Sequence, residues 1–282
     1  MIIDFHTHAF PDSIAPKAIP ILEEKGNLCA YTDGTISDLR KKMEENHIDY
    51  SLVLPVATSP KQVKSINTFA IEVNNKYKET HILSFGGLHP DYIDYEEEII
   101  RLKESGIKGI KLHPPYQDTY IDDIKYINII DKAFEFGLIV ILHAGIDIGI
   151  PGDPKVTPDR ILNMMNGLHH KGKLVLAHMG SWGLWDQVYS KLLGKDIYID
   201  TAFSLGYCYQ KEKRIPLLSK EDFKRFVLKH GADKILFGTD CPWAIGAPYI
   251  EFIKESGIHK EDIDKILGEN AYHLLEIEDC KN

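Results

Sequence analysis

The sequence predicts an α/β protein, a (β/α)8 TIM barrel that forms one domain over residues 1–282 with a helical extension at its C-terminus. Short apolar segments rich in β-branched residues alternate along the chain with longer amphipathic segments. Strands that alternate with helices pair in parallel through right-handed crossovers, and eight such units close a barrel. A doubly wound open sheet is disfavoured, because Phe5–His8 stands where a glycine-rich dinucleotide loop would follow the first strand.

Each unit of the barrel is predicted from a strand pattern and the helical pattern that follows it. The predicted strands are Ile2–His6, Tyr50–Pro55, Ile82–Leu88, Gly109–His113, Ile139–His143, Leu174–His178, Ile197–Thr201 and Ile235–Thr239. The predicted helices are Ile36–Asn46, Lys61–Tyr77, Tyr95–Glu104, Ile124–Phe136, Pro158–His169, Leu184–Leu193, Glu221–Lys229 and Pro248–Glu255. Thr157 is a typical N-cap for the helix that begins at Pro158. Further helical turns are expected over Ile258–Ile277.

Composition favours a soluble protein without nucleic acid or membrane partners. The net charge of −9 offers no basic face for a phosphate backbone. No apolar run approaches the ~20 residues of a membrane helix. The cysteines are scattered and the N-terminus lacks the pattern of a secretory signal, so we expect a cytoplasmic protein that begins at residue 1. The sequence is compatible with a monomer or a homo-oligomer.

The tripeptide His6-Thr7-His8 ends the first predicted strand. Side chains two residues apart in a strand point to the same face, so the two imidazoles stand roughly 7 Å apart. They can therefore converge on one ion about 2 Å from each nitrogen. A hydrogen-bonded surface pair is the alternative, and partners elsewhere in the chain must decide between the two.

Four predicted strands end in residues that can bind a metal. His6 and His8 end the first strand, His143 the fifth and His178 the sixth, and Asp240 follows the eighth. Each of these could separately be a core, loop or turn residue. The C-terminal ends of barrel strands, however, meet at one face of the fold, where the active site forms. We therefore expect the five side chains to lie together.

These motifs resemble the amidohydrolase superfamily, and specifically the amidohydrolase-related branch that includes 2-amino-3-carboxymuconate 6-semialdehyde decarboxylase and related hydrolases. The resemblance covers nearly the whole chain. The segments that carry it are Asp4–His8, Gly109–Pro114, Leu142–Gly145, Ala177–Gly180, Phe237–Trp243 and Ile266–Ala271.

The resemblance implies a divalent metal held by His6, His8, His143 and Asp240, with His178 either completing the site or lying beside it as an acid/base. Imidazole and carboxylate ligands favour Zn²⁺, with Mn²⁺ and Fe²⁺ as alternatives and one ion favoured over two. A bound metal lowers the pKa of its water to about 7. Asp240 would take the proton of that water and return it to the leaving group, while His178 would polarise or protonate the substrate.

The role of Lys111 distinguishes the alternative arrangements of the site. By strand alternation, Lys111 and His113 face the barrel interior, whereas Ile110 and Leu112 face the helices. Three roles are open for Lys111: a carbamylated bridge between two ions, as in two-metal members of the superfamily, a partner for a substrate carboxylate, or a structural ion pair. His113 and Trp243 are the other expected substrate contacts.

The sequence therefore predicts a metal-dependent hydrolase that attacks a small molecule through metal-activated water. The alternative is a non-oxidative decarboxylase of an aromatic or muconate-like acid, in which His178 handles the proton. A non-catalytic metal-binding barrel is the third interpretation. It is disfavoured because a purely structural metal site needs no open position for water, whereas a catalytic site does. The substrate is expected to be a small molecule, with a carboxylate as one candidate group. The loop Gly145–Pro158 is long enough to cover the site.

Overall fold

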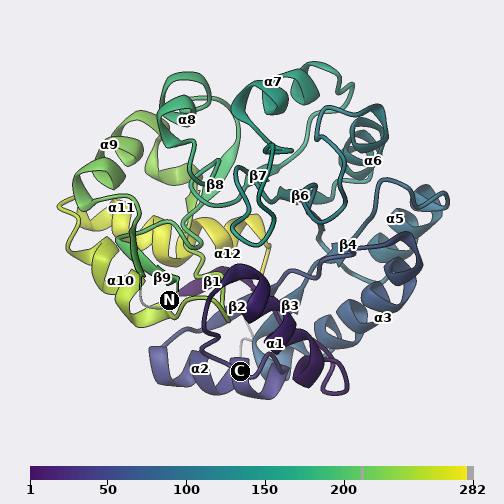
Figure 1. The fold of residues 1–282 in the computed structure, drawn as a ribbon, viewed down its shortest axis with the longest axis horizontal. Coiled ribbons are helices and arrows are strands. Elements are labelled where there is room, and N and C mark those ends of the chain that lie inside the picture. The colour runs from purple at the N-terminus through teal and green to yellow at the C-terminus, as the bar shows by residue number, and fades with distance from the viewer. Residues whose placement is uncertain (211–212, 278–282) are drawn as a thin grey trace.

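Parallel strands form the wall of a barrel, and helices surround them (Figure 1). The computed structural model describes residues 1–210 and 213–277. In these residues the strands of the wall are β1 (Ile3–Thr7), β2 (Tyr50–Val53), β3 (Ile82–Ser84), β4 (Gly86–Gly87), β5 (Gly109–Leu112), β6 (Ile139–Leu142), β7 (Leu174–Leu176), β8 (Tyr198–Asp200) and β11 (Ile235–Leu236). Each lies within or beside one of the predicted strand segments.

The wall closes on itself. Hydrogen bonds join β1, β2 and β3 in one run and β11, β8, β7, β6, β5 and β4 in another. Only Phe85 separates β3 from β4, so the predicted strand Ile82–Leu88 supplies one position in the wall. At the other seam the Phe5 N–H donates to the Phe237 carbonyl at 2.8 Å, and Thr7 forms a parallel bridge with Cys241. The predicted barrel is therefore confirmed.

Helices follow most strands, as the alternation predicts. They are α1 (Ala15–Gly26), α2 (Ile36–Asn46), α3 (Val63–Asn74), α4 (Tyr77–Thr80), α5 (Tyr95–Glu104), α6 (Ile124–Glu135), α7 (Pro158–Asn166), α8 (Trp185–Lys191), α9 (Lys220–His230), α10 (Gly246–Lys254), α11 (Lys260–Asp264) and α12 (Asn270–Leu274). At the start of α7 the Thr157 side chain accepts a hydrogen bond from the Arg160 N–H, so Thr157 is the N-cap, as predicted. The predicted helix Lys61–Tyr77 is divided among a 3₁₀ turn at Pro60–Gln62, α3 and α4.

Two elements were not predicted from the sequence. Helix α1 contains Pro20 in its interior, and a proline there disguises a helical pattern. The second element is an antiparallel pair, β9 (Tyr207–Gln210) and β10 (Lys213–Pro216), which follows β8. Both elements lie at the end of the barrel where the strands finish, and Leu22 and Gly26 of α1 line the cavity found there.

The core has two layers that set the direction of each strand side chain. Ile110 and Leu112 of β5 pack outward against the helices, while Phe5, Phe85 and Ile141 belong to a separate apolar cluster inside the wall. The predicted alternation along β5 is therefore confirmed, and it turns the Lys111 side chain inward, where the residue is 1% exposed.

The C-terminal extension covers the opposite end of the barrel from the predicted site. Ala271, Leu275 and Ile277 join the inner apolar cluster beside Phe5, so the predicted helical turns complete that core. A π-helical turn, Lys265–Glu269, connects α11 to α12. Among the described residues, no helix combines the length and the apolar character that a membrane crossing needs.

Candidate metal centre

The strand ends bring all of the predicted site residues to one cavity of about 170 Å³. Its lining includes His6, His8, Lys111, His113, His143, His178, Asp240 and Trp243. They lie in β1 and β5 or in the segments that follow β1, β5, β6, β7 and β11. The cavity therefore lies at the C-terminal end of the barrel, where the fold places active sites.

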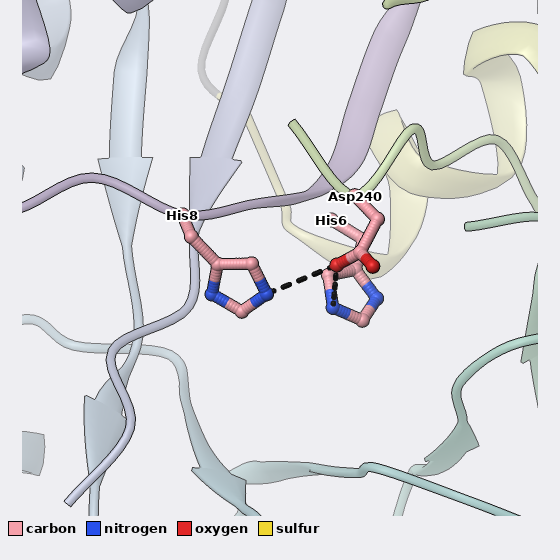
Figure 2. A group of neighbouring side chains, drawn as sticks. All are labelled: His6, His8 and Asp240. Carbon is pink, nitrogen blue, oxygen red and sulfur yellow. Dashed lines mark hydrogen bonds and ion pairs between the residues drawn. The ribbon is translucent and has the colours of Figure 1, made fainter. Parts of the chain in front are cut away.

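His6, His8 and Asp240 form the first ligand group (Figure 2). His6 Nδ1 lies 2.8 Å from the Asp200 carboxylate, and His8 Nδ1 lies 2.7 Å from the Leu54 carbonyl. Both partners accept hydrogen bonds, so each Nδ1 carries the proton and each Nε2 presents a lone pair. Asp240 Oδ1 lies 3.3 Å from His6 Nε2 and 3.1 Å from His8 Nε2.

This group has the chemistry of a cation site. Burial, together with Lys111, lowers the pKa of His6 well below its usual range, so the ring is neutral. Burial raises the pKa of Asp240, whereas a hydrogen bond from His8 and positive charge on the nearby rings, His6 first among them, lower it overall. Two imidazole lone pairs and a carboxylate oxygen thus face one point. These groups repel one another unless a positive charge lies between them. Imidazole and carboxylate are ligands of Zn²⁺ and related divalent ions, and the residues present fit such an ion.

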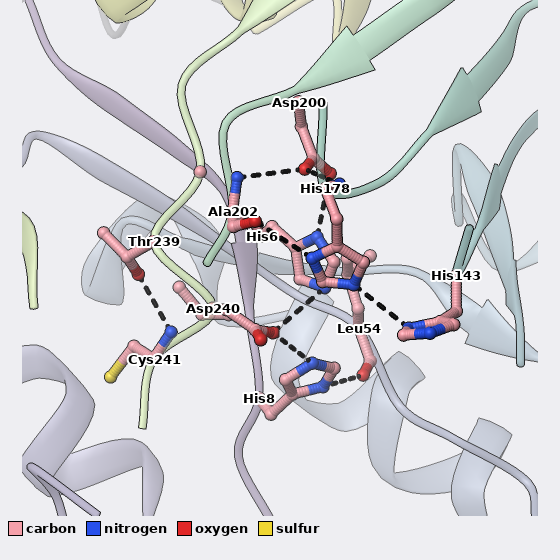
Figure 3. A network of polar contacts seen from close by, with 12 residues as sticks. His6, His8, Leu54, His143, His178, Asp200, Ala202, Thr239, Asp240 and Cys241 are labelled. Atoms are coloured by element: carbon pink, nitrogen blue, oxygen red, sulfur yellow. Dashed lines mark hydrogen bonds and ion pairs between the residues drawn. The ribbon is translucent and has the colours of Figure 1, made fainter. Parts of the chain in front are cut away.

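Asp200 is a site residue that the sequence analysis did not identify. Its carboxylate is fully buried, and it accepts from the ring of His6 and from the backbone N–H of His178 at 2.9 Å (Figure 3). It therefore fixes the tautomer and direction of His6 from behind, as carboxylates do in many metal sites. The available signal was an aspartate inside the apolar strand segment Ile197–Thr201.

We expect Asp200→Asn to weaken metal binding by about 10- to 100-fold, because a neutral amide oxygen is a weaker acceptor than a carboxylate for the N–H of His6. Competition with a fluorescent chelator measures this affinity. Asp264→Asn makes the same chemical change on the exposed surface of α11 and should leave the affinity unchanged. Equal affinity in the two variants would refute the role assigned to Asp200.

His178 and His143 form a pair beside the first group (Figure 3). His178 Nδ1 lies 2.9 Å from the Ala202 carbonyl, and its Nε2 lies 3.0 Å from His143 Nδ1. The His178 ring centre is 5.1 Å from that of His6. His178 adopts a φ of 61°, which is unusual for a residue with a side chain, and the hydrogen bond from its N–H to Asp200 supports it.

His143 and His113 face a carboxylate that the sequence analysis did not identify. Asp147 lies in the predicted covering loop, and its Oδ2 is 3.5 Å from His113 Nε2 and 3.9 Å from His143 Nε2. The loop reaches the cavity because Gly145 pairs with Val156 and with Trp182. Gly145 has a φ of 95°, and a Cβ there would lie 2.2 Å from the Trp182 nitrogen, so only glycine fits. A loop aspartate carries no sequence signal of its own.

Lys111 lies in direct contact with the first group. Its Nζ donates to His6 Nε2 at 3.2 Å. Burial lowers the pKa of Lys111 to about 8, although Asp200 and Asp240 act in the opposite direction. Among the ion pairs of the described residues none includes Lys111, so the structural ion pair has no support in the geometry.

Aromatic side chains line the rest of the cavity. Trp243 lies one turn beyond Asp240, and its N–H donates to the Asp240 carbonyl at 2.8 Å. Trp182 and Tyr116 also line the cavity, whereas Tyr207 and Tyr209 of the hairpin line a neighbouring one. We predict Trp243 as a substrate contact, and the position of Trp182 extends the same apolar wall.

Comparison with known proteins agrees with this architecture. No curated protein sequence matches the chain. Similar solved structures include 5-carboxyvanillate decarboxylase LigW from Sphingomonas paucimobilis, with a TM-score of 0.68, 16% identity and coverage of 98% of this chain and 99% of that one. The uncharacterized TIM-barrel protein Bb4693 from Bordetella bronchiseptica has a TM-score of 0.73 at 16% identity, with 98% of each chain covered. Dihydroxybenzoic acid decarboxylase from Polaromonas sp. JS666, with bound manganese and 2-nitroresorcinol, has a TM-score of 0.62 at 16% identity, covering 98% of this chain and 96% of that one.

The solved structures, at this identity, establish the fold. The sequence model of the amidohydrolase family matches residues 3–277, which is nearly the whole chain. The match includes both ends of the site, from His6 on β1 to Asp240 after β11. The chain therefore belongs to the amidohydrolase family.

Proposed function

We propose that this protein is a metal-dependent hydrolase of a small molecule, with a divalent cation held by His6, His8 and Asp240. The observation that carries the proposal is the convergence of two imidazole lone pairs and one carboxylate oxygen at a cavity wall. A cation bound there would activate water and polarise the substrate carbonyl. Zn²⁺ suits these ligands, and the manganese in one structural neighbour keeps Mn²⁺ as the alternative.

The residues of the chain supply the proton transfers. Asp240 is ionised at neutral pH because its pKa lies below the usual range, so it can accept a proton from the attacking water and return it to the leaving group. His178 lies beside His6 and would polarise or protonate the substrate, or complete the ligand set with His143. Lys111, His113 and Trp243 line the same cavity and would position the substrate.

Decarboxylation is the second candidate, and two observations favour it. Two of the structural neighbours named above are decarboxylases of aromatic acids. The cavity also combines a cationic lysine with an aromatic wall, which suits a carboxylate on an unsaturated ring. In that reaction the carbon–carbon bond to the carboxylate breaks, and His178 would deliver the proton to the ring carbon.

One assay set separates the two candidates. The purified holoenzyme is incubated with a panel of lactones and amides and with a panel of hydroxylated aromatic acids, and both hydrolysis and carbon dioxide release are followed. We expect turnover in the hydrolysis panel. Carbon dioxide release without any hydrolysis would refute the hydrolase proposal and support the decarboxylase. A protein without stoichiometric metal, whose activity and melting temperature do not respond to added metal, would refute both.

Removing the cation with a chelator should abolish turnover and lower the melting temperature. A ligand at 100 times its Kd stabilises the folded state by about 2.7 kcal/mol, and chelation removes that contribution. Differential scanning calorimetry with and without chelator measures the loss, and added Zn²⁺ should restore both properties. An unchanged melting temperature would contradict a cation bound only to the folded protein.

A further inference from the structure

A second cavity, of about 240 Å³, lies beside the metal cavity. Leu28, Phe203 and Trp243 line both cavities, so a molecule that lies against these three side chains extends from one cavity into the other. Among the described residues that line the second cavity, none is acidic or basic, whereas the metal cavity contains all of the predicted metal ligands. The two cavities are therefore adjacent and differ sharply in polarity.

The second cavity is built by β9 of the hairpin, by α10 and by the segment that follows α1. The Arg214 guanidinium lies over the Tyr207 ring, 3.9 Å from its centre, and the Tyr209 ring packs edge-on against Tyr207 with centres 5.4 Å apart. The Gln210 side chain donates to the Gly26 carbonyl at 3.3 Å. These contacts hold the aromatic side of the hairpin and join it to the end of α1, which lines the metal cavity.

Two side chains that line the second cavity carry donors for a ligand. The indole N–H groups of Trp182 and Trp185 both donate to backbone carbonyls, whereas that of Trp243 has no acceptor among the described residues. Tyr249 is 6% exposed, and its hydroxyl likewise donates to none of them. Burial raises the pKa of Tyr249, so the hydroxyl keeps its proton. Since buried phenol and indole donors usually find an acceptor, both fit an oxygen of a bound molecule.

The sizes of the cavities indicate how a ligand is divided between them. The metal cavity, at about 170 Å³, holds little more than one ring, because a cavity of about 150 Å³ is large enough to bind benzene. The second cavity is larger and can hold another ring. Together they reach the size of ordinary small-molecule sites, about 300–1,000 Å³. The polar reacting group belongs beside the metal ligands, and an apolar remainder belongs in the uncharged cavity.

We propose that the substrate has two parts: a polar reacting group that binds in the metal cavity, and an aromatic arm that binds in the second cavity. An oxygen on the arm accepts a hydrogen bond from the Tyr249 hydroxyl. The inference rests on the proposed function, because the metal places the reacting group, and it adds the substrate class. It holds for hydrolysis and for decarboxylation alike.

The test uses hydroxamic acids, which chelate Zn²⁺, as probes of the Zn²⁺-loaded protein in isothermal titration calorimetry. Acetohydroxamic acid carries only the metal-binding group, and phenylalkyl hydroxamic acids of increasing chain length add an aromatic arm. We expect the best arm to tighten binding by about 10- to 100-fold. Cys208 is 9% exposed and lines only the second cavity. Cys208→Phe should abolish the gain by filling that cavity and leave acetohydroxamic acid binding unchanged, while the matched control Cys208→Ala should keep the gain.

Tyr249→Phe tests the hydrogen bond at nearly constant volume. A methoxy group on the phenyl arm should lose about 3- to 10-fold in affinity in this variant, whereas the unsubstituted arm should lose nothing. A crystal structure of the complex needs no variant, and it should show the arm against Tyr249.

The outcomes separate this inference from the proposed function. Binding of acetohydroxamic acid with no gain from any arm, a gain that a folded Cys208→Phe retains, or an arm that lies in the metal cavity would overturn the two-part substrate and leave the metal site intact. Failure of every hydroxamic acid to bind would refute the metal site, and the two-part substrate with it.

Discussion

Replacing Asp240 with asparagine should reduce kcat by on the order of 10³-fold or more. The substitution replaces one carboxylate oxygen by an amide NH2 and removes the negative charge that lies 3.1 Å from His8 Nε2 and 3.3 Å from His6 Nε2, and with it the proposed proton acceptor. Loss of a positioned general base alone costs about 10²- to 10⁴-fold. Weaker metal binding adds to that loss. Steady-state kinetics at saturating metal measures the effect.

The fold should survive this substitution. Asp240 has a φ of 73°, in the left-handed region that asparagine also tolerates. The hydrogen bonds that place it, from its N–H to the His6 carbonyl and from the Trp243 N–H to its carbonyl, belong to the backbone. The melting temperature of the metal-free variant should therefore match that of the metal-free parent. Asp233→Asn, an exposed change near β11, serves as the control, and normal turnover in Asp240→Asn would refute the assigned role.

The barrel and the meeting of its strand-end side chains follow from local patterns in the sequence. Strand period decides which side chains face inward, so the inward direction of Lys111 could be predicted from Ile110 and Leu112 alone. Parallel strands in a closed barrel all end at the same face, so His6 and Asp240 could be expected to meet although they are far apart in the chain. These inferences need no knowledge of loop geometry.

The residues that the sequence did not predict depend on long-range contacts. Asp200 acquires its role only because its carboxylate meets His6, which is 194 positions away in the chain. Asp147 reaches the cavity because Gly145 pairs with two separate segments, and no period or motif encodes such a loop path. Helix α1 was missed because Pro20 interrupts its pattern. Supporting groups and loop residues therefore need the structure.

Replacing Lys111 with methionine should separate the three roles that the sequence left open. The ammonium would lie 3.2 Å from a ligand nitrogen of the cation, and two unit charges about 4 Å apart repel by about 4 kcal/mol at an effective dielectric constant of 20. The metal-loaded enzyme should therefore hold this lysine as a neutral amine or as a carbamate until a substrate carboxylate binds beside it and stabilises the ammonium. Its pKa, lowered to about 8 by burial, makes either form accessible near neutral pH.

We expect Lys111→Met to lower kcat/KM by on the order of 10²-fold. The melting temperature should stay the same or rise, because methionine replaces a buried amine that forms no ion pair with a carboxylate among the described residues. A loss carried by KM, with metal content unchanged, assigns the lysine to a substrate carboxylate. A loss of metal, together with a carbon dioxide adduct on Lys111 in the mass spectrum of the parent enzyme, assigns it to a carbamate. Unchanged kinetics with a lower melting temperature would show a structural role, which the absence of an ion pair argues against.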